Sequence, residues 1–241
     1  ITGGTITPSS YSINTTSGFG IYAYAGTGSA GTIAHGLGVA PECVLVKKTS
    51  GADSWWMYHK SMGTSYYLVL NTAVAGTSNT AAWNDTAPTD TLIHLGDAGN
   101  TNSSSGSPTY IMYAFAPKKG YSAFGKYLGI GTYKGNGSTD GTFIYTGFRP
   151  AYILVKRNDA AYNWGLQDTA RDTYNPADET LNADDAASVQ TGSGQYIDYL
   201  SNGFKLRNDS SWWNANGMHY IYATFAEFPI VSSNSKAGTA R

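Results

Sequence analysis

The chain has 241 residues, which is enough for one large or two small hydrophobic cores. Charged residues make up only 13% of it and the net charge is −1, so it lacks the excess of positive charge on which binding to nucleic acid or to anionic membranes depends. It has one cysteine and no apolar run as long as a membrane helix, so we expect neither an internal disulfide nor insertion into a membrane.

Short β-branched or aromatic runs alternate with clusters of Gly, Ser, Asn, Asp and Thr along the whole chain, and this pattern predicts strands joined by turns. No stretch shows ten or more residues of helical period. The expected strands are 20–24, 42–48, 55–59, 66–71, 91–95 and 109–116, then 141–145, 151–157, 164–168, 196–200, 204–207 and 219–225. Six or seven short strands per roughly 100 residues favour antiparallel β-sandwiches of the jelly-roll or lectin-like kind.

The second half of the chain repeats phrases of the first half at an offset of 109 to 111 residues. A unit of this length is a small domain and not one turn of a solenoid, whose repeats run about 20–50 residues. The matched phrases are Val44–Lys48 with Ile153–Arg157, Trp55 with Trp164, Leu70-Asn71 with Leu181-Asn182, and Tyr110–Ala116 with Tyr220–Ala226. The sequence therefore predicts two tandem sandwiches related by internal duplication.

Four segments follow from this repeat. Residues 1–17 are expected to form an extended N-terminal segment, 18–117 the first sandwich, 118–230 the second, and 231–241 a C-terminal tail of small polar residues. The joint around Pro117 is short, so the two copies are expected to pack together.

Several longer phrases resemble a known family. They are His35–Pro41, Trp83–Thr86, Gly135–Gly141, Gly147–Pro150, Asp168–Asn175, Ile197–Lys205 and Tyr220–Glu227. Together they resemble an uncharacterised family of domains found near the ends of tail-fibre-like and other virion proteins of bacteriophages, especially marine ones. The resemblance implies a place on a phage particle outside the cell, beside other virion proteins, and it supplies no catalytic residue.

Several aromatic residues are candidates for ligand contact. The loop 208–217 carries Trp212 and Trp213 followed by Asn214, where the resemblance suggests small polar residues, and Trp56 beside Trp55 also exceeds what the shared fold requires. Tyr66 and Tyr67 form a second pair beside turn-forming residues. Neighbouring side chains on a strand point to opposite faces, so one of each pair should be exposed. Exposed aromatic rings beside amides suit sugars, because a ring stacks on the apolar face of the sugar while amides bind hydroxyls. Packing of these loops, or contact with a neighbouring subunit, is the competing interpretation.

Catalysis is not expected. Glycosidases need two carboxylates about 5–10 Å apart, and of the three glutamates neither Glu42 nor Glu227 has a counterpart in the other repeat. The cluster of Asp168, Arg171 and Asp172 could be an acid–base site, but an arginine that orders a loop between two carboxylates is the simpler interpretation. The four histidines show no metal-ligand spacing and no cofactor motif is present, so we expect neither metal nor cofactor. Asp184-Asp185 could ligate Ca²⁺ together with loop carbonyls, but a solvated loop or helix end is the simpler interpretation.

The leading hypothesis is the C-terminal part of a phage tail fibre that binds a host-surface carbohydrate or protein. The alternatives are a capsid decoration or tail-assembly protein without a ligand, and a glycan-cleaving tail enzyme. Phage fibres are usually trimers, and the low charge and the 19 tyrosines fit a surface that meets protein neighbours. We therefore expect a homo-oligomer, and a trimer in particular.

Overall fold

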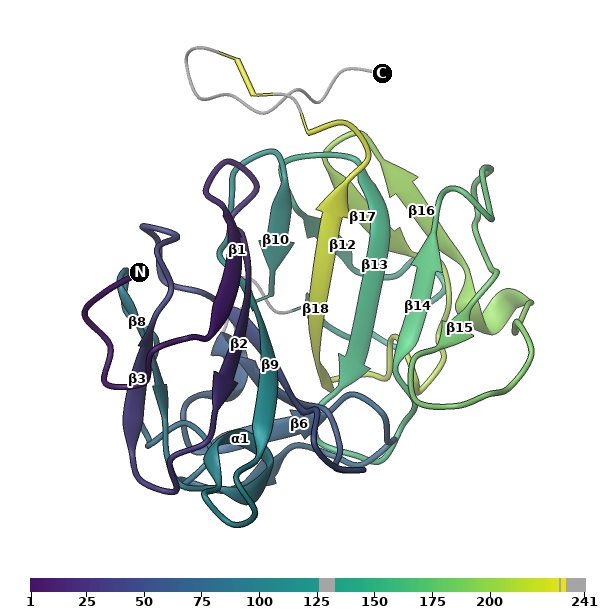
Figure 1. The fold of residues 1–241 in the computed structure, drawn as a ribbon. Helices are drawn as coiled ribbons and strands as arrows, with labels where there is room; N and C mark the ends of the chain where they lie inside the picture. The colour runs from purple at the N-terminus through teal and green to yellow at the C-terminus, as the bar shows by residue number, and fades with distance from the viewer. Residues whose placement is uncertain (126–132, 230, 233–241) are drawn as a thin grey trace. The chain divides into compact units, whose positions relative to one another are not determined.

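A computed structural model describes residues 1–125, 133–229 and 231–232 of the chain, and the structure is built from antiparallel strands (Figure 1). Within the described residues, helix is limited to the single α-turn α1 (Gly99–Asn102) and to two 3₁₀ turns, Lys60–Met62 and Ser193–Gln195. The predicted all-β fold is confirmed.

The chain divides into two compact units. Unit 1 comprises Ile1–Asn71 and Gly76–Pro117, and unit 2 comprises Thr72–Ala75 and the chain from Lys118 onward. The predicted extended segment 1–17 is not separate from the first repeat, because β1 (Ser10–Asn14) pairs with β2 (Phe19–Ala25) and so belongs to the sheet of unit 1.

Unit 1 is a sandwich of two antiparallel sheets. The large sheet has the strand order β1-β2-β9-β4-β5-β6-β7, and the small sheet pairs β3 with β8. Its core is a single buried cluster with side chains from both sheets, such as Val44 and Ile93. The remaining bounds are β3 (Gly31–Ala34), β4 (Cys43–Lys48), β5 (Trp56–His59), β6 (Tyr66–Val69), β7 (Thr77–Ser78), β8 (Leu92–Leu95) and β9 (Thr109–Phe115).

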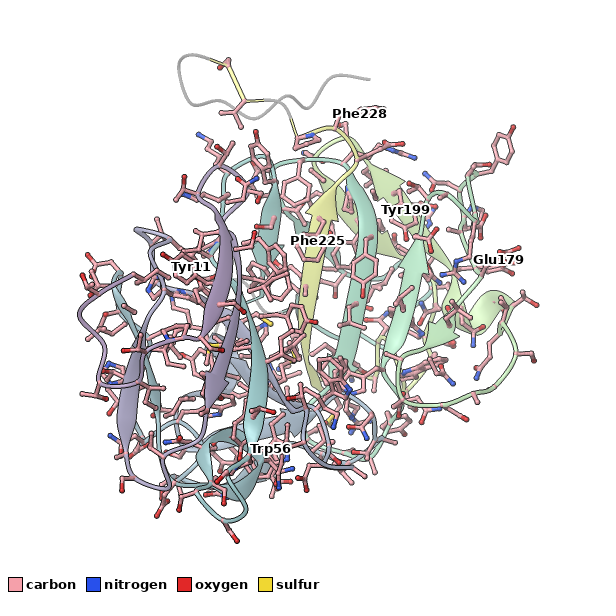
Figure 2. All side chains as sticks on the ribbon, viewed as in Figure 1. Tyr11, Trp56, Glu179, Tyr199, Phe225 and Phe228 are labelled. Carbon is pink, nitrogen blue, oxygen red and sulfur yellow. The ribbon has the colours of Figure 1, made fainter. Side chains whose placement is uncertain are left out.

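Unit 2 repeats this plan. One sheet runs β10-β18-β13-β14-β15, with β11 also paired to β18, and the other runs β12-β17-β16. The rings of Phe204 and Tyr222, one from each sheet, meet edge to face with centroids 5.7 Å apart in the core. Side chains fill both units (Figure 2). The bounds are β10 (Ser122–Phe124), β11 (Tyr133–Lys134), β12 (Phe143–Tyr145), β13 (Pro150–Arg157), β14 (Gly165–Asp168), β15 (Leu181–Asn182), β16 (Ile197–Leu200), β17 (Gly203–Leu206) and β18 (His219–Ala226).

A buried asparagine holds the turn between β2 and β3 in unit 1. The Asn102 side-chain oxygen accepts from the backbone N–H of Thr27 at 2.8 Å, and its NH₂ donates to the carbonyls of Ser29 and Gly96 at 2.7 and 2.9 Å. Two of these bonds satisfy backbone groups of the turn, and the third satisfies the carbonyl of Gly96 after β8.

Asn214 makes the same three bonds in unit 2. Its oxygen accepts from the backbone N–H of Asn136 at 3.0 Å, and its NH₂ donates to the carbonyls of Ser138 and Asn208 at 2.9 and 2.6 Å. The offsets from the unit 1 partners are 109 residues for the turn and 112 for Asn214 itself. Matched bonds of this kind are what a duplication predicts, and the duplication itself stays a prediction.

Strand pairing corrects one of the sequence matches. The sequence aligns Leu70-Asn71 with Leu181-Asn182, but Asn182 faces Gly165 in unit 2 where Val69 faces Trp56 in unit 1. The match is therefore shifted by two residues, because the segment between these strands is longer in unit 2 than in unit 1.

Candidate functional site

The tryptophan pair in loop 208–217 lies mostly inside unit 2. Trp213 is fully buried in the core, with its ring against the backbone of Gly165: a Cβ added to this glycine would lie 2.3 Å from Trp213 Cζ2. Trp212 is half-buried and its Nε1 donates to the carbonyl of Asn163 at 2.6 Å. Asn214 is also fully buried, with its amide bonded to backbone. The predicted ligand contact is wrong for Trp213 and Asn214, because the core and the turn already use both side chains.

The pair Tyr66 and Tyr67 on β6 follows the predicted alternation. Tyr66 is exposed, whereas Tyr67 stacks on Trp56 with centroids 3.7 Å apart and planes 12° apart. Beside Tyr66, the hydroxyls of Thr64 and Ser65 both donate to Asp85, at 2.8 and 2.7 Å. Tyr66 thus stays a weaker candidate for ligand contact, and Tyr67 serves mainly to cover Trp56.

A stronger candidate lies on β12, which the sequence did not single out. Phe143 and Tyr145 are 42% and 68% exposed, while Ile144 between them is buried. Side chains two residues apart on a strand share a face and stand about 6.6 Å apart. The outer face of the β12-β17-β16 sheet therefore presents two aromatic rings side by side, and we call it the aromatic face.

Charged side chains continue the aromatic face across β17 and β16. Lys205 faces Phe143 on one side and Asp198 on the other. Lys205 Nζ lies 2.6 Å from Asp140 Oδ1, and Arg207 Nε lies 2.9 Å from Asp198 Oδ2, with Arg207 Nη1 3.6 Å from Asp140. Each charge has a partner of opposite sign, so the face is close to neutral and its polar groups are held in place by one another.

These ion pairs make Asp140 unsuitable as a general acid. The hydrogen bond from Lys205 holds the pKa of Asp140 below its usual range, with Arg207 adding a smaller effect in the same direction. A general acid needs a raised pKa so that it carries a proton near neutral pH. Asp140 is ionised there and can only accept hydrogen bonds or balance charge.

Comparison of the two units shows how the aromatic face could have been found from the sequence. Ile33 on β3 and Ile144 on β12 are both buried and pair with the matched strands β8 and β17. The residues that flank Ile33 are Thr32 and Ala34, where unit 2 has two aromatics. Aligning the two halves of the sequence on this isoleucine shows aromatic residues in one half where the other has small ones. Since the strand forms with small residues in unit 1, the fold does not require aromatic residues at these positions.

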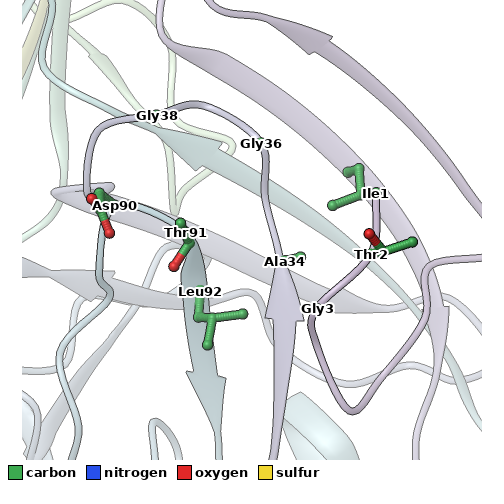
Figure 3. Close-up of a pocket in the computed structure, with 9 residues that line it drawn as sticks. All are labelled: Ile1, Thr2, Gly3, Ala34, Gly36, Gly38, Asp90, Thr91 and Leu92. Atoms are coloured by element: carbon green, nitrogen blue, oxygen red, sulfur yellow. The ribbon is translucent and has the colours of Figure 1, made fainter.

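Unit 1 contains a pocket of about 440 Å³ between the N-terminal segment and the loops after β3 and before β8 (Figure 3). Its lining residues are Ile1, Thr2, Gly3, Ala34, Gly36, Gly38, Asp90, Thr91 and Leu92. Asp90 supplies the one side-chain carboxylate of this lining, so the pocket lacks the second carboxylate that hydrolysis of glycans requires. Nearby His35 is buried, which lowers its pKa, and both ring nitrogens are engaged, with Thr89 and with the Leu37 N–H.

The charged cluster of unit 2 orders a loop. Arg171 Nε lies 2.6 Å from Asp168 Oδ2, while the other oxygen of Asp168 accepts from the backbone N–H groups of Ala170 and Arg171. Asp172 likewise accepts from two backbone N–H groups, those of Asp178 and Glu179. Burial alone would raise the pKa of Asp168, but the hydrogen bonds and the charge of Arg171 hold it below its usual range. The bonds that both carboxylates accept from backbone fit the loop-ordering interpretation.

Lys156 is a buried cation with a cradle of carbonyl groups. It is 0% exposed, and its Nζ donates to the carbonyls of Tyr162, Ala73 and Ala160 at 2.6, 3.1 and 3.3 Å. Burial lowers the pKa of Lys156 to about 8, with the nearby Asp184 acting in the opposite direction. Lys156 thereby holds the segment Thr72–Ala75 to the rest of unit 2.

The part of the chain that the structure describes contains no group of three or more His, Cys, Asp or Glu side chains placed to hold a metal ion. It also contains no helix that is long and apolar enough to cross a membrane.

These features define the class of protein: an all-β chain of two sandwich units whose second unit presents an aromatic sheet face. Residues 1–229 match the model of a family described as a domain of unknown function, DUF7483, and the chain belongs to that family. No curated protein and no solved structure matches the chain. The family description states no activity.

Proposed function

We propose that this chain is part of a bacteriophage virion, most simply the end of a tail fibre, and that its aromatic face binds a neutral carbohydrate of the host surface. The phage setting is supported by the phrases of the sequence that resemble virion domains. The binding role is supported by one observation above the others: two exposed aromatic side chains stand on one sheet face at positions where the other unit has Thr32 and Ala34.

The chemistry of the aromatic face fits a neutral sugar. The apolar face of a pyranose ring stacks on Phe143 or Tyr145, which removes apolar surface of both from water. The ion-paired side chains of Asp140, Asp198 and Arg207 supply acceptors and donors for the hydroxyls, and their mutual contacts hold them ready to bind. An acidic glycan would have to compete with the carboxylates for Lys205 and Arg207.

Binding to host cells, or to their isolated surface polysaccharide, tests the proposal. The Phe143→Ala, Tyr145→Ala double variant should bind at least ~10-fold more weakly, since aromatic anchors contribute about 2 kcal/mol or more at true binding sites. Its melting temperature should hardly change, because both side chains are exposed. Tyr11→Ala, which removes an exposed tyrosine of unit 1, is the matched control and should bind as the parent does.

Other outcomes would change the proposal in specific ways. Unchanged binding by the double variant would show that the aromatic face is not the binding site. Tyr66 and Trp212 would then be the remaining candidates. A change in oligomeric state would instead favour a structural virion protein whose neighbour covers the face. Release of reducing sugar from the polysaccharide would favour the glycan-cleaving enzyme, which the geometry of the carboxylates disfavours.

The proposed assembly is a homo-oligomer, and in a fibre a trimer. The many tyrosines and the low charge of the chain support it. Light scattering at micromolar concentration measures it directly, and labelling of intact particles with an antibody to this chain places it on the capsid or on the tail.

A further inference from the structure

In unit 1, the N-terminal segment covers the free edge of the small sheet. The backbone N–H of Ile6 donates to the carbonyl of Thr32 on β3 at 2.8 Å. The N–H of Thr32 donates to the hydroxyl of Thr5 at 2.8 Å, and the N–H of Thr5 donates to the hydroxyl of Thr32 at 3.1 Å. These bonds satisfy the backbone groups of Thr32 that point away from β8.

The residues that cover this edge are Gly4, Thr5 and Ile6, and each makes a specific contact with β3. A Cβ on Gly4 would lie 2.6 Å from the carbonyl oxygen of Thr32 and 2.7 Å from the N of Ala34, so the contact requires glycine. The Ile6 side chain is buried and reaches Gly31, where a Cβ would lie 2.8 Å from Ile6 Cδ1. Since Gly4 lies near Ala34 and Ile6 near Gly31, the segment runs antiparallel to β3.

In unit 2, the matching edge is that of β12. The N–H of Leu206 donates to the carbonyl of Thr142 and the N–H of Thr146 donates to that of Asn202, so the even-numbered residues of this strand face β17. The backbone N–H and C=O groups of Phe143 and Tyr145 therefore point to the outer edge. No described residue hydrogen-bonds to them there, and β12 pairs with β17 alone.

We propose that the outer edge of β12 binds an extended strand of a different protein, in the way that β3 binds residues 4–6 of its own chain. The partner strand runs antiparallel to β12 and carries glycine followed by threonine. The glycine allows close approach to the backbone of β12, and the threonine hydroxyl accepts from the N–H of Phe143. The next residue of the partner donates its N–H to the carbonyl of Phe143.

The third residue of this partner is smaller than the Ile6 of unit 1. Thr142 stands where unit 1 has Gly31, and the Cβ that it adds occupies the space of the isoleucine end. The proposed pattern is therefore Gly-Thr followed by a small residue such as Ala. Strand addition extends the sheet within its plane, so the aromatic face stays open and this proposal does not depend on the carbohydrate proposal.

A synthetic peptide with the sequence of residues 2–8 and the change Ile6→Ala tests the edge. It should bind saturably when titrated into the whole chain, and NMR should show the amide signals of Phe143 and Tyr145 shifting and their hydrogen exchange slowing. The same peptide, N-methylated at the backbone nitrogen of the substituted residue, cannot donate to the carbonyl of Phe143 and should bind ~10-fold more weakly. This control alters only the peptide, so folding of the protein is not in question.

Three results would overturn the proposal. No binding at millimolar peptide would show that the edge is not a docking site. Exchange effects confined to Thr32 would show that the peptide only displaces residues 4–6 from unit 1. Protection of the Phe143 amide that rises with protein concentration, without peptide, would make a second copy of this chain the occupant.

Discussion

Replacing Gly165 by alanine tests whether Trp213 is a core residue of unit 2. The new Cβ would lie 2.3 Å from Trp213 Cζ2 and 2.7 Å from Cη2, which is too close for both to stay in place. Overpacking of this kind costs about 1–3 kcal/mol. Trp213→Ala opens a large cavity in the same place and should cost about 3–5 kcal/mol.

The double variant separates packing from other causes. In the Trp213→Ala background the alanine at position 165 points into the cavity, so it should cost almost nothing or even stabilise. The two single costs would then exceed the cost of the double variant by about 1–3 kcal/mol, a coupling expected only for residues in contact. Trp213→Phe should cost less than Trp213→Ala, because it keeps most of the ring and also removes an indole N–H that has no partner within the described residues.

Denaturant unfolding followed by tryptophan fluorescence measures these free energies. Unit 1 serves as the internal control, since its buried Cys43 should become reactive at the same denaturant concentration in every variant. Additive costs would show that Gly165 and Trp213 do not share space. A Trp213→Ala variant of unchanged stability would show that the ring lies in solvent, as a ligand-binding residue would.

Three further outcomes follow from the structure. Asn102→Ala and Asn214→Ala should each destabilise their own unit by about 2–3 kcal/mol, since each leaves buried backbone groups unpaired; clearly unequal losses in equilibrium unfolding would show that the matched turns are not equivalent. Burial lowers the pKa of Lys156 to about 8, so the unfolded chain binds more protons than the folded chain between pH 8 and 10.5. The free energy of unfolding should therefore rise with pH over that range, by at most about 1.4 kcal/mol per pH unit, when compared with that of Lys156→Met. Equal pH slopes in the two proteins would contradict this. Burial also raises the pKa of Cys43, so alkylation of native protein at pH 8 should be far slower than alkylation of the unfolded chain, as mass spectrometry would show.

Periodic hydrophobicity was sufficient to predict the longer strands of the two large sheets, β2, β4, β5, β6 and β9 in unit 1 and β13, β14 and β18 in unit 2, but not the short strands β7, β10, β11 and β15. In β2 and β9, buried and partly exposed residues alternate as the sequence pattern requires. The segment before residue 18 was harder to interpret, because β1 has no buried side chain and pairs with β2 through its backbone. Such an edge strand leaves little hydrophobic pattern in the sequence.

The candidate site was predicted poorly for a physical reason. An exposed tryptophan and a buried one look alike in a loop sequence, and what distinguishes Trp213 is Gly165, which lies 48 residues earlier and leaves room for the ring. The residue of unit 1 that matches Gly165 is Trp56, because it pairs with Val46 as Gly165 pairs with Val155. The side chain of Trp56 is buried in the core of unit 1. Each core thus receives a large aromatic side chain, from the strand in one unit and from the loop in the other, so Trp213 replaces core volume and is not an addition to the fold.

The same comparison explains why Phe143 and Tyr145 are better evidence of function. Their counterparts in unit 1 are Thr32 and Ala34, so the matched strand is built with small side chains at these two positions. In unit 2, no described residue pairs with the outer edge of β12, and two aromatic rings are exposed beside it. Exposing apolar rings to water is unfavourable, so their exposure calls for an explanation. Packing explains why Trp213 lies in a loop of unit 2 while Trp56 lies on a strand of unit 1. It does not explain the pair Phe143 and Tyr145, and a residue that packing leaves unexplained is where binding should be sought first.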